Sequence, residues 1–240
     1  MQLHSLIQIV KQRYIDLWNK PFGVFQLVGT VILIVAMGQW IPTFLNFIQN
    51  RPGVYLNDFV LNIVPAIDVS MPLFVSCYFV IAIAIFIMAS EPKILTITLQ
   101  TYLMLTLVRM LCIYLVPLEA PEAYVDLKDP FAELFVYAGK PINKDLFFSG
   151  HTSTMVLLIL GTPFQRLKPY FTFFAILVAV LLLVQHAHYF IDVIFAPFVT
   201  VLCFKFISML HHTKIDWTNG EVAIYDNHYE IKFLQKSLKN

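Results

Sequence analysis

Two histidines and one aspartate have the residue types and spacing that phosphoryl-transfer chemistry uses. His188 and Asp192 are four residues apart, so on a helix they share one face. A carboxylate that holds one imidazole nitrogen fixes the tautomer and leaves the other nitrogen as a nucleophile or base. The other histidine, His151, could then act as a general acid toward the leaving group. We therefore predict His188 as the nucleophile, Asp192 as the group that orients it, and His151 as the acid.

Four further residues are predicted to bind substrate: Arg109, Asp145, Ser149 and Gly150. Arg109 carries a planar, permanently charged guanidinium that suits phosphate oxygens. It could instead reach lipid headgroups or pair with an acid such as Asp145. Ser149 and Gly150 could also be a simple helix start, because Ser caps helices and Gly forms turns. The histidine–aspartate pair likewise could stabilise a short loop at the membrane interface.

The elements that carry these residues must lie in a membrane. Of the 240 residues, 59% are hydrophobic and only 13% are charged, and the mean hydropathy is +0.74. A soluble domain carries about 25% charged residues, so this chain needs lipid to cover its apolar surface. Ionisable residues inside membrane segments are expensive and are functional candidates by default. The net charge of +1 argues against nucleic acid as a partner.

The sequence indicates neither a cofactor nor a metal ion. The three cysteines fall inside apolar stretches without ligand-like spacing, so we interpret them as small buried hydrophobic residues. The chain has no Gly-rich phosphate loop and no cage of carboxylates. We therefore expect a reaction that needs no cofactor and no metal.

Six apolar runs are predicted to cross the bilayer, judged against the roughly 20 residues that a spanning helix needs. They are Phe22–Ile48, Met71–Ala89, Ile94–Val116, Thr152–Phe164, Tyr170–Gln185 and Phe190–Leu210. The fourth run is short and could begin earlier, at Leu146. Residues 1–20 are expected to form an amphipathic helix on the membrane surface, residues 21–210 a six-helix catalytic domain, and residues 211–240 a polar cytoplasmic tail with only local structure. The predicted fold is an all-α polytopic membrane protein.

The distribution of lysine and arginine predicts the orientation of the spans. If six spans alternate, one side of the membrane receives Lys11, Arg13, Lys20, Lys93, Arg166, Lys168, Lys205, Lys214, Lys232, Lys236 and Lys239. The opposite side receives Glu119, Glu122, Asp126, Asp129, Glu133 and Asp145, together with Lys128, Lys140 and Lys144. We therefore expect both termini in the cytoplasm and the candidate site on the extracytoplasmic face. Lys144 is interpreted as a solvated loop charge and Tyr189 as part of the interfacial aromatic belt.

Two stretches resemble the type 2 phosphatidic acid phosphatase superfamily, and within it the sphingomyelin synthase-like branch. The stretches are Asp145–Thr152 (DLFFSGHT) and His188–Ala196 (HYFIDVIFA), similar to the D-x-x-x-S-G-H-T and H-Y-x-x-D-x-x-x-A of that branch. The branch also has an arginine late in its third span before a proline-bearing stretch, and Arg109 followed by Pro117 resembles this feature. The resemblance covers roughly residues 98–207.

The chain departs from the typical phosphatases of this superfamily at their basic residues. Those enzymes carry Lys-x6-Arg-Pro, whereas here Tyr102 stands in place of the lysine and Met110 follows the arginine. They also carry Ser-Arg before the last histidine, where this chain has Leu181-Leu182. The synthase-like branch lacks the same basic residues, although its Cys-Gly before the aspartate is Asn143-Lys144 here.

The resemblance implies a two-step reaction through a phosphohistidine. His188 would attack the phosphorus of a lipid phosphodiester or monoester while His151 protonates the departing group. The phosphoryl moiety would then pass to an alcohol, such as ceramide or diacylglycerol, or to water. The expected partners are a phospholipid donor and a lipid alcohol or water as acceptor. Two alternatives remain open: a lipid phosphate phosphatase that uses the same histidines, and a non-catalytic membrane protein that binds lipid.

Overall fold

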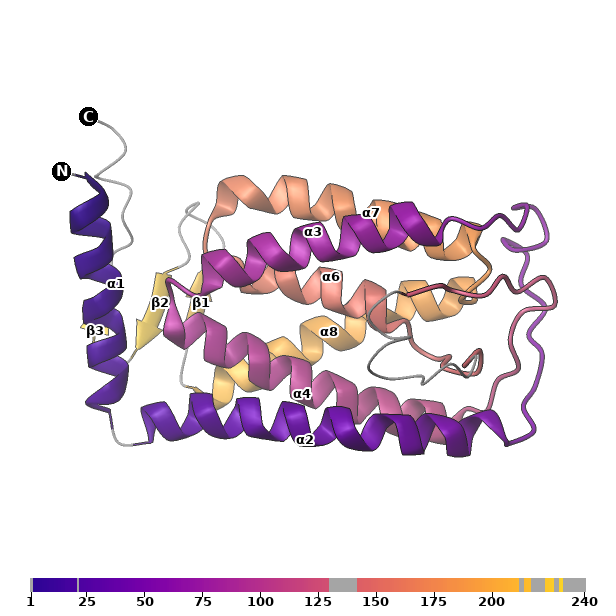
Figure 1. The fold of residues 1–240 in the computed structure, drawn as a ribbon, viewed down its shortest axis with the longest axis horizontal. Coiled ribbons are helices and arrows are strands. Elements are labelled where there is room, and N and C mark those ends of the chain that lie inside the picture. Colours follow the sequence, from indigo (N-terminus) through magenta and orange to yellow (C-terminus); the bar gives the residue numbers. More distant parts are fainter. Residues whose placement is uncertain are drawn as a thin grey trace.

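The computed structural model is an elongated bundle of helices with one further helix lying across one end (Figure 1). It describes residues 2–20, 22–129 and 142–211, and three short strands beyond them. The elements are α1 (Gln2–Trp18), α2 (Gly23–Gln49), α3 (Ser70–Met88), α4 (Pro92–Leu115), α6 (Gly150–Gly161), the 3-10 helix η2 (Gln165–Leu167), α7 (Lys168–Val184), α8 (Phe190–Leu210), β1 (Lys214–Asp216), β2 (Ala223–Asp226) and β3 (Tyr229–Glu230).

The bundle is that of an integral membrane protein. Five helical stretches are long and apolar enough to cross a membrane: Gly23–Gln49, Ser70–Met88, Pro92–Leu115, Gln165–Val184 and Phe190–Leu210. Their outward faces carry large apolar side chains, such as Phe25 at 74% exposure and Phe86 at 83%. Exposed apolar surface on this scale is stable only against lipid. The predicted all-α polytopic fold is therefore confirmed, and five of the six predicted spans are found.

The remaining predicted span, the fourth in chain order, corresponds to the short helix α6. Its 12 residues rise about 18 Å, well under the ~30 Å of a hydrocarbon core. The helix does not start at Leu146, because Ser149 is extended and its hydroxyl accepts the amide hydrogen of Thr152, which caps the helix at Gly150. α6 packs against α3, α4, α7 and α8, so it lies at the centre of the bundle. Its short length is therefore compensated by the longer helices around it.

Gly161, at the end of α6, explains how closely α6 packs against α4. A Cβ atom on Gly161 would lie 2.4 Å from the hydroxyl oxygen of Thr98. A larger residue here would separate the two helices. Because α4 carries Arg109 and α6 carries His151, this contact fixes the spacing between two helices of the candidate site.

Helix α1 is attached to the turn between α3 and α4. The guanidinium of Arg13 forms an ion pair with Glu91 and donates to the carbonyl oxygen of Ser90 at 3.1 Å. The hydroxyl of Tyr14 donates to the carbonyl oxygen of Ala89 at 2.9 Å. Residues 2–18 are thus helical as predicted, and the helix lies across the axis of the bundle (Figure 1). Its placement on a membrane surface remains a prediction.

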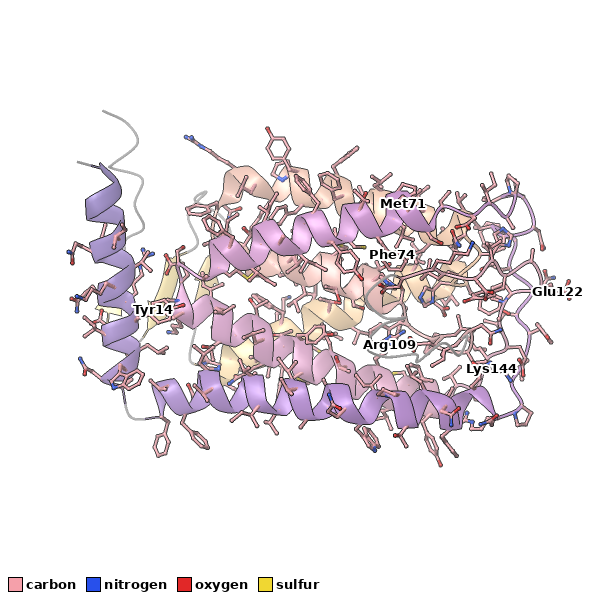
Figure 2. All side chains as sticks on the ribbon, in the orientation of Figure 1. Tyr14, Met71, Phe74, Arg109, Glu122 and Lys144 are labelled. Carbon is pink, nitrogen blue, oxygen red and sulfur yellow. The ribbon has the colours of Figure 1, made fainter. Side chains whose placement is uncertain are left out.

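The candidate site lies at the opposite end of the bundle. α4 and α7 end there and α6 and α8 begin there (Figure 1), so Arg109, His151 and His188 reach the same level. Figure 2 shows Arg109 inside this end, with Glu122 and Lys144 closer to its tip. Glu133 and Lys140, which the sequence also assigns to this side, lie outside the described residues.

Beyond α8, the described part of the tail forms a small antiparallel sheet in the order β1-β2-β3. The expectation of only local structure in residues 211–240 remains a prediction. Lys232, Lys236 and Lys239 lie outside the described residues. The division into residues 1–20, 21–210 and 211–240 remains our proposal for the domain organisation.

Candidate active site

The two histidine-bearing stretches meet through a backbone hydrogen bond. The amide of Ser149 donates to the carbonyl oxygen of Asp192 at 3.1 Å. This bond joins the residue before α6 to the first turn of α8, although the two are 43 positions apart (192 − 149). The helix N-termini that carry His151 and His188 are therefore held against each other. Both helices direct the positive ends of their dipoles toward this region.

His188 and Asp192 form the pair that the sequence predicts. The Nδ1 atom of His188 lies 3.3 Å from Oδ2 of Asp192. The same Oδ2 accepts the amide hydrogen of Tyr189 at 3.2 Å, so the carboxylate caps the helix start as well as holding the imidazole. Asp192 is fully buried and His188 is 4% exposed. When Nδ1 carries its proton toward the carboxylate, Nε2 keeps its lone pair.

His151 stands in the first turn of α6, where it lines two cavities. A small one of about 50 Å³ is bounded by His188, His151 and Arg109 together. A larger one of about 260 Å³ is also bounded by His151 and Arg109. The imidazole meets the ring of Phe74 in α3 edge to face, with centroids 5.6 Å apart. The two predicted catalytic histidines thus face one common space.

The larger cavity extends from this space between α2, α3, α4 and α6. Its apolar lining comes from Ile41, Phe74, Ile81, Leu105 and Met155, while Tyr102 and Thr106 add hydroxyl groups. An apolar cavity that ends at His151, Arg109, Asp129 and Asp145 has the polarity of an amphiphile with a charged head.

Arg109 is held by the stretch that precedes α6. Its Nε atom donates to the carbonyl oxygen of Phe148 at 2.8 Å, and its Nη2 atom lies 2.8 Å from a carboxylate oxygen of Asp145. Nη2 also donates to the carbonyl oxygen of Asp145 at 3.2 Å. The structure therefore contains the Arg109–Asp145 pair, which is one of the alternatives for this arginine. A guanidinium fixed in this way still borders both cavities.

Gly150 allows Arg109 to lie across the start of α6. A Cβ atom at this position would be 3.2 Å from both Cζ and Nε of the arginine. Ser149 is fully buried, and its hydroxyl oxygen accepts from the amide and the hydroxyl of Thr152 at 3.3 and 3.2 Å. Ser149 is thus a helix cap in this structure. Roles for Ser149, Gly150, Asp145 and Arg109 in binding substrate remain predictions.

Two residues near the site do not match their predicted environments. Lys144 is not a solvated loop charge: its Nζ atom donates to Glu119 and to the carbonyl oxygen of Arg51, both at 2.7 Å. This lysine holds the pKa of Glu119 below its usual range. Tyr189 is not in an aromatic belt, because it is 1% exposed and its hydroxyl donates to the carbonyl oxygen of Glu119 at 3.0 Å.

Two further residues support the turn before α8, and sequence reasoning missed them. Gln185 is fully buried, and its side chain accepts from the amide of Val69 at 2.5 Å and donates to the carbonyl oxygen of Asp126 at 3.0 Å. Asp58 accepts the amide hydrogen of Phe190 at 2.5 Å. Each contact joins segments more than 50 residues apart, so no local pattern signals it.

His186 lies outside the candidate site, as its position two residues from His188 predicts. Its Nε2 atom lies 2.8 Å from the carbonyl oxygen of Val64, and its ring lines a separate outer cavity of about 360 Å³. Among the residues that the structure describes, no group of three His, Cys, Asp or Glu side chains could hold a metal ion.

Residues 144–210 match a family model described as PAP2 superfamily C-terminal. The matched segment contains Asp145, His151, His188 and Asp192, whereas Arg109 lies outside it. The match supports the type 2 phosphatidic acid phosphatase superfamily and, in general terms, an activity of the lipid phosphatase or phosphotransferase type. No curated protein matches the chain.

Proposed function

We propose that this membrane protein is a sphingomyelin synthase-like phosphotransferase, which moves a phosphoryl group or phospho-headgroup between lipids through a phosphohistidine. The observation that carries the proposal is the shared cavity in which His188, held by Asp192, faces His151 and Arg109. A nucleophile, an orienting carboxylate, a second proton-transfer group and a fixed cation are the parts that metal-independent phosphoryl transfer needs.

In the first step, Nε2 of His188 attacks the phosphorus atom of the donor lipid. The N–P bond forms as the bond from phosphorus to the departing oxygen breaks, and protonated His151 gives its proton to that oxygen. The carboxylate of Asp192, 3.3 Å from Nδ1, stabilises the positive charge that the imidazole gains. The step yields a free lipid alcohol and a phosphohistidine.

In the second step, the acceptor hydroxyl attacks the phosphohistidine. Neutral His151 takes the hydroxyl proton, a new O–P bond forms and the N–P bond breaks, which restores the lone pair on His188. His151 is then protonated again and ready for the next donor. Over a full cycle His151 therefore gives one proton to the leaving oxygen and takes one from the acceptor hydroxyl, so no proton is consumed in the transfer reaction.

Charge in the site supports a phosphodiester donor over a phosphate monoester. Among the described residues that line the two cavities, Arg109 is a cation, while Asp129 and Asp145 are anions. A phosphodiester carries one negative charge, whereas a monoester near pH 7 carries nearly two. A site in which two anions accompany one cation stabilises the singly charged group more easily than the doubly charged one. Donors such as phosphatidylcholine or phosphatidylethanolamine are therefore favoured over phosphatidic acid.

The positions at which the phosphatases carry a lysine and an arginine also favour a phosphodiester donor here. Tyr102, which stands where the phosphatases carry lysine, lines the larger cavity. Leu182, at the place of their arginine, is fully buried in the bundle.

Hydrolysis with water as acceptor is the second candidate, and the family match of residues 144–210 supports it. The proposed substrates are lipids because the larger cavity is apolar and adjoins the membrane-spanning helices.

The distribution of basic residues supports the proposed orientation. Lys93 lies in the first turn of α4, Arg166 lies in η2, and Lys11 and Arg13 lie in α1, all at the end of the bundle opposite the site (Figure 1). Cytoplasmic loops carry such an excess of Lys and Arg. We therefore place both termini in the cytoplasm and the active site on the extracytoplasmic face.

An assay on purified protein in lipid nanodiscs tests the proposal. Phosphatidylcholine, phosphatidylethanolamine and phosphatidic acid are supplied as donors, with labelled ceramide and diacylglycerol as acceptors. We expect a new headgroup-bearing lipid from wild type and from His211→Ala, a histidine at the far end of α8, and none from His188→Ala. Free phosphate from phosphatidic acid without transfer would identify a phosphatase. Equal background in wild type and His188→Ala on all donors would refute a catalytic role for this histidine.

A further inference from the structure

A loop far from the histidines in sequence contacts the turn that precedes α8. Residues 53–61, here called the outer strap, follow α2 and lie outside the matched family segment. Val54 pairs with the segment after α4: its amide donates to Pro117 and its carbonyl oxygen accepts from Glu119, both at 3.0 Å. Gly53 is needed here, because a Cβ atom would lie 2.6 Å from the carbonyl carbon of Leu118. The strap is thus held firmly to the segment that follows α4.

Asp58 is the residue of the outer strap whose side chain binds the start of α8, next to His188. Its Oδ2 atom accepts the amide hydrogen of Phe190 at 2.5 Å. Its Oδ1 atom accepts from the amides of Val60 and Leu61 at 2.9 and 3.3 Å, which fixes the carboxylate within its own loop. The rings of Phe59 and Phe190 meet edge to face, 5.7 Å apart. The contact therefore joins a rigid part of the strap to the first residue of α8.

The two amides that follow His188 are each held by a different carboxylate. Asp192 accepts from the amide of Tyr189, and Asp58 accepts from the amide of Phe190. The hydroxyl of Tyr189 adds a third attachment, since it also accepts from the amide of Leu56 in the strap at 3.3 Å. The backbone on the C-terminal side of His188 is thereby fixed from two directions.

We infer that Asp58 is a positioning residue for His188, an inference that rests on the proposed function. Its carboxylate fixes the backbone of the turn so that the imidazole faces the phosphorus atom. A negative charge at the start of α8 is also favourable for the helix dipole. Asp58 lines the outer cavity with Tyr55 and His186, whereas His188 lines the cavity that also contains His151. Asp58 therefore acts from the reverse side of the turn, without contact with substrate.

Kinetics distinguish this role from a general contribution to folding. A displaced nucleophile slows the chemical step, while binding of the lipid in the larger cavity is unaffected. Misplacement by about 1 Å can cost about 100-fold in rate. For Asp58→Ala we therefore expect kcat to fall by about 10- to 100-fold, with KM within about threefold of wild type. Asp58→Asn keeps a carbonyl oxygen for the Phe190 amide, but its amide nitrogen then faces the amides of Val60 and Leu61, so it should recover only part of the rate.

The donor side of the same hydrogen bond offers a second test. Phe190→Pro removes the amide hydrogen at the first position of a helix, where proline is well tolerated. The preceding residue, Tyr189, has φ −70° and ψ 155°, which suits a residue before proline. Phe190→Ala is the matched control, because it loses the ring but keeps the amide. We expect Phe190→Pro to slow kcat beyond Phe190→Ala, and Asp58→Ala to add little further loss in the Phe190→Pro background.

The experiment measures kcat, KM and the single-turnover rate of phosphohistidine formation for these variants in nanodiscs. Asp126→Ala, an exposed aspartate at the same end of the bundle, is the control and should match wild type. If wild type is active through His188 but Asp58→Ala keeps its kcat, the positioning role is refuted while the proposed function stands. Equal kcat for Phe190→Pro and Phe190→Ala would also refute it. If wild type shows no His188-dependent activity, the proposed function fails and the inference fails with it.

Discussion

Replacement of Asp192 by asparagine removes the charge beside the proposed nucleophile and keeps its geometry. Both hydrogen bonds of the carboxylate, from His188 and from the Tyr189 amide, use the same oxygen, Oδ2. An asparagine carbonyl oxygen in that place can accept both. The amide nitrogen then takes the place of Oδ1, which is buried and has no hydrogen-bond partner among the described residues. His188 therefore keeps its tautomer and orientation, and only the electrostatic contribution is lost.

The size of that contribution follows from the geometry. With charge centres about 4 Å apart and an effective dielectric constant of about 20, the attraction between imidazolium and carboxylate is about 4 kcal/mol. A full positive charge on His188 in the transition state would thus correspond to a loss of roughly 1000-fold in rate. A half-developed charge, worth about 2 kcal/mol, corresponds to roughly 30-fold. We expect kcat of Asp192→Asn to lie between these limits, with KM little changed.

The measurement is the steady-state transfer of headgroup to labelled acceptor, combined with acid-quenched detection of the phosphohistidine in a single turnover. The buried amide nitrogen costs about 1–3 kcal/mol of stability, so rates must be compared at a temperature where thermal unfolding shows both proteins to be folded. Activity within about threefold of wild type would refute the electrostatic role that the charge calculation assigns to Asp192. So would a rise in KM alone, because substrate binding does not require the charge on this carboxylate.

Three further substitutions have expected outcomes that the structure supports. Gly150→Ala places a Cβ atom 3.2 Å from Cζ of Arg109, so the guanidinium must shift by a few tenths of an ångström; we expect kcat/KM to fall by roughly 3- to 10-fold in the transfer assay, and an unchanged value would show that the arginine is not used. Burial raises the pKa of Glu91 from its ordinary value of 4.5 to about 7, despite the opposing effect of Arg13. Because the folded-state pKa is the higher one, the contribution of Glu91 to stability is fully present below about pH 4.5 and is lost as pH rises to about 7; Glu91→Gln should remove this part of the slope, worth about 3 kcal/mol, in thermal unfolding between pH 4.5 and 8, and a slope equal to that of wild type would contradict the assignment. Tyr189→Phe leaves the two backbone groups that its hydroxyl bonds at 3.0 and 3.3 Å without that partner, so we expect a loss of about 1–3 kcal/mol in unfolding free energy; wild-type stability would mean that water replaces the hydroxyl.

The sequence predicts the spans and the histidine–aspartate pair because both depend on local patterns. Hydropathy over some 20 residues locates a spanning helix without knowledge of its neighbours. The four-residue spacing of His188 and Asp192 brings them together on any helix, and the structure has this contact. Alternation of the spans also predicts that His151 and His188 share one end of the bundle. The length of α6 is harder to predict, because Ser149 ends the extended segment by capping, and the neighbouring helices allow so short a helix.

The environments of Lys144 and Tyr189 depend on contacts that no local pattern contains. Lysine in an extracytoplasmic loop and tyrosine at a membrane interface are usually exposed to water and headgroups. Here the partners of Lys144 are 25 and 93 residues away, and those of the Tyr189 hydroxyl are 70 and 133 residues away. Glu119 provides one partner to each of these residues, through its carboxylate and its carbonyl oxygen. Glu119 thus connects the segment before α6, through Lys144, with the turn before α8, through Tyr189. These contacts can be seen only in the folded chain.

The segment that resembles a known family cannot form this site without the preceding half of the chain. Residues 144–210 contain the proposed nucleophile His188, the proposed acid His151 and the proposed orienting residue Asp192. The cation beside them, Arg109, comes from α4, and the larger cavity also has walls from α2 and α3. The contact that we assign to positioning comes from Asp58 in the strap between α2 and α3. Specificity for lipid and acceptor should therefore depend mainly on residues outside the family match, where the chain diverges from the phosphatase pattern. Exchange of α3 residues that line the cavity should change which lipid is used without abolishing phosphohistidine formation, because His188 and Asp192 keep their contacts.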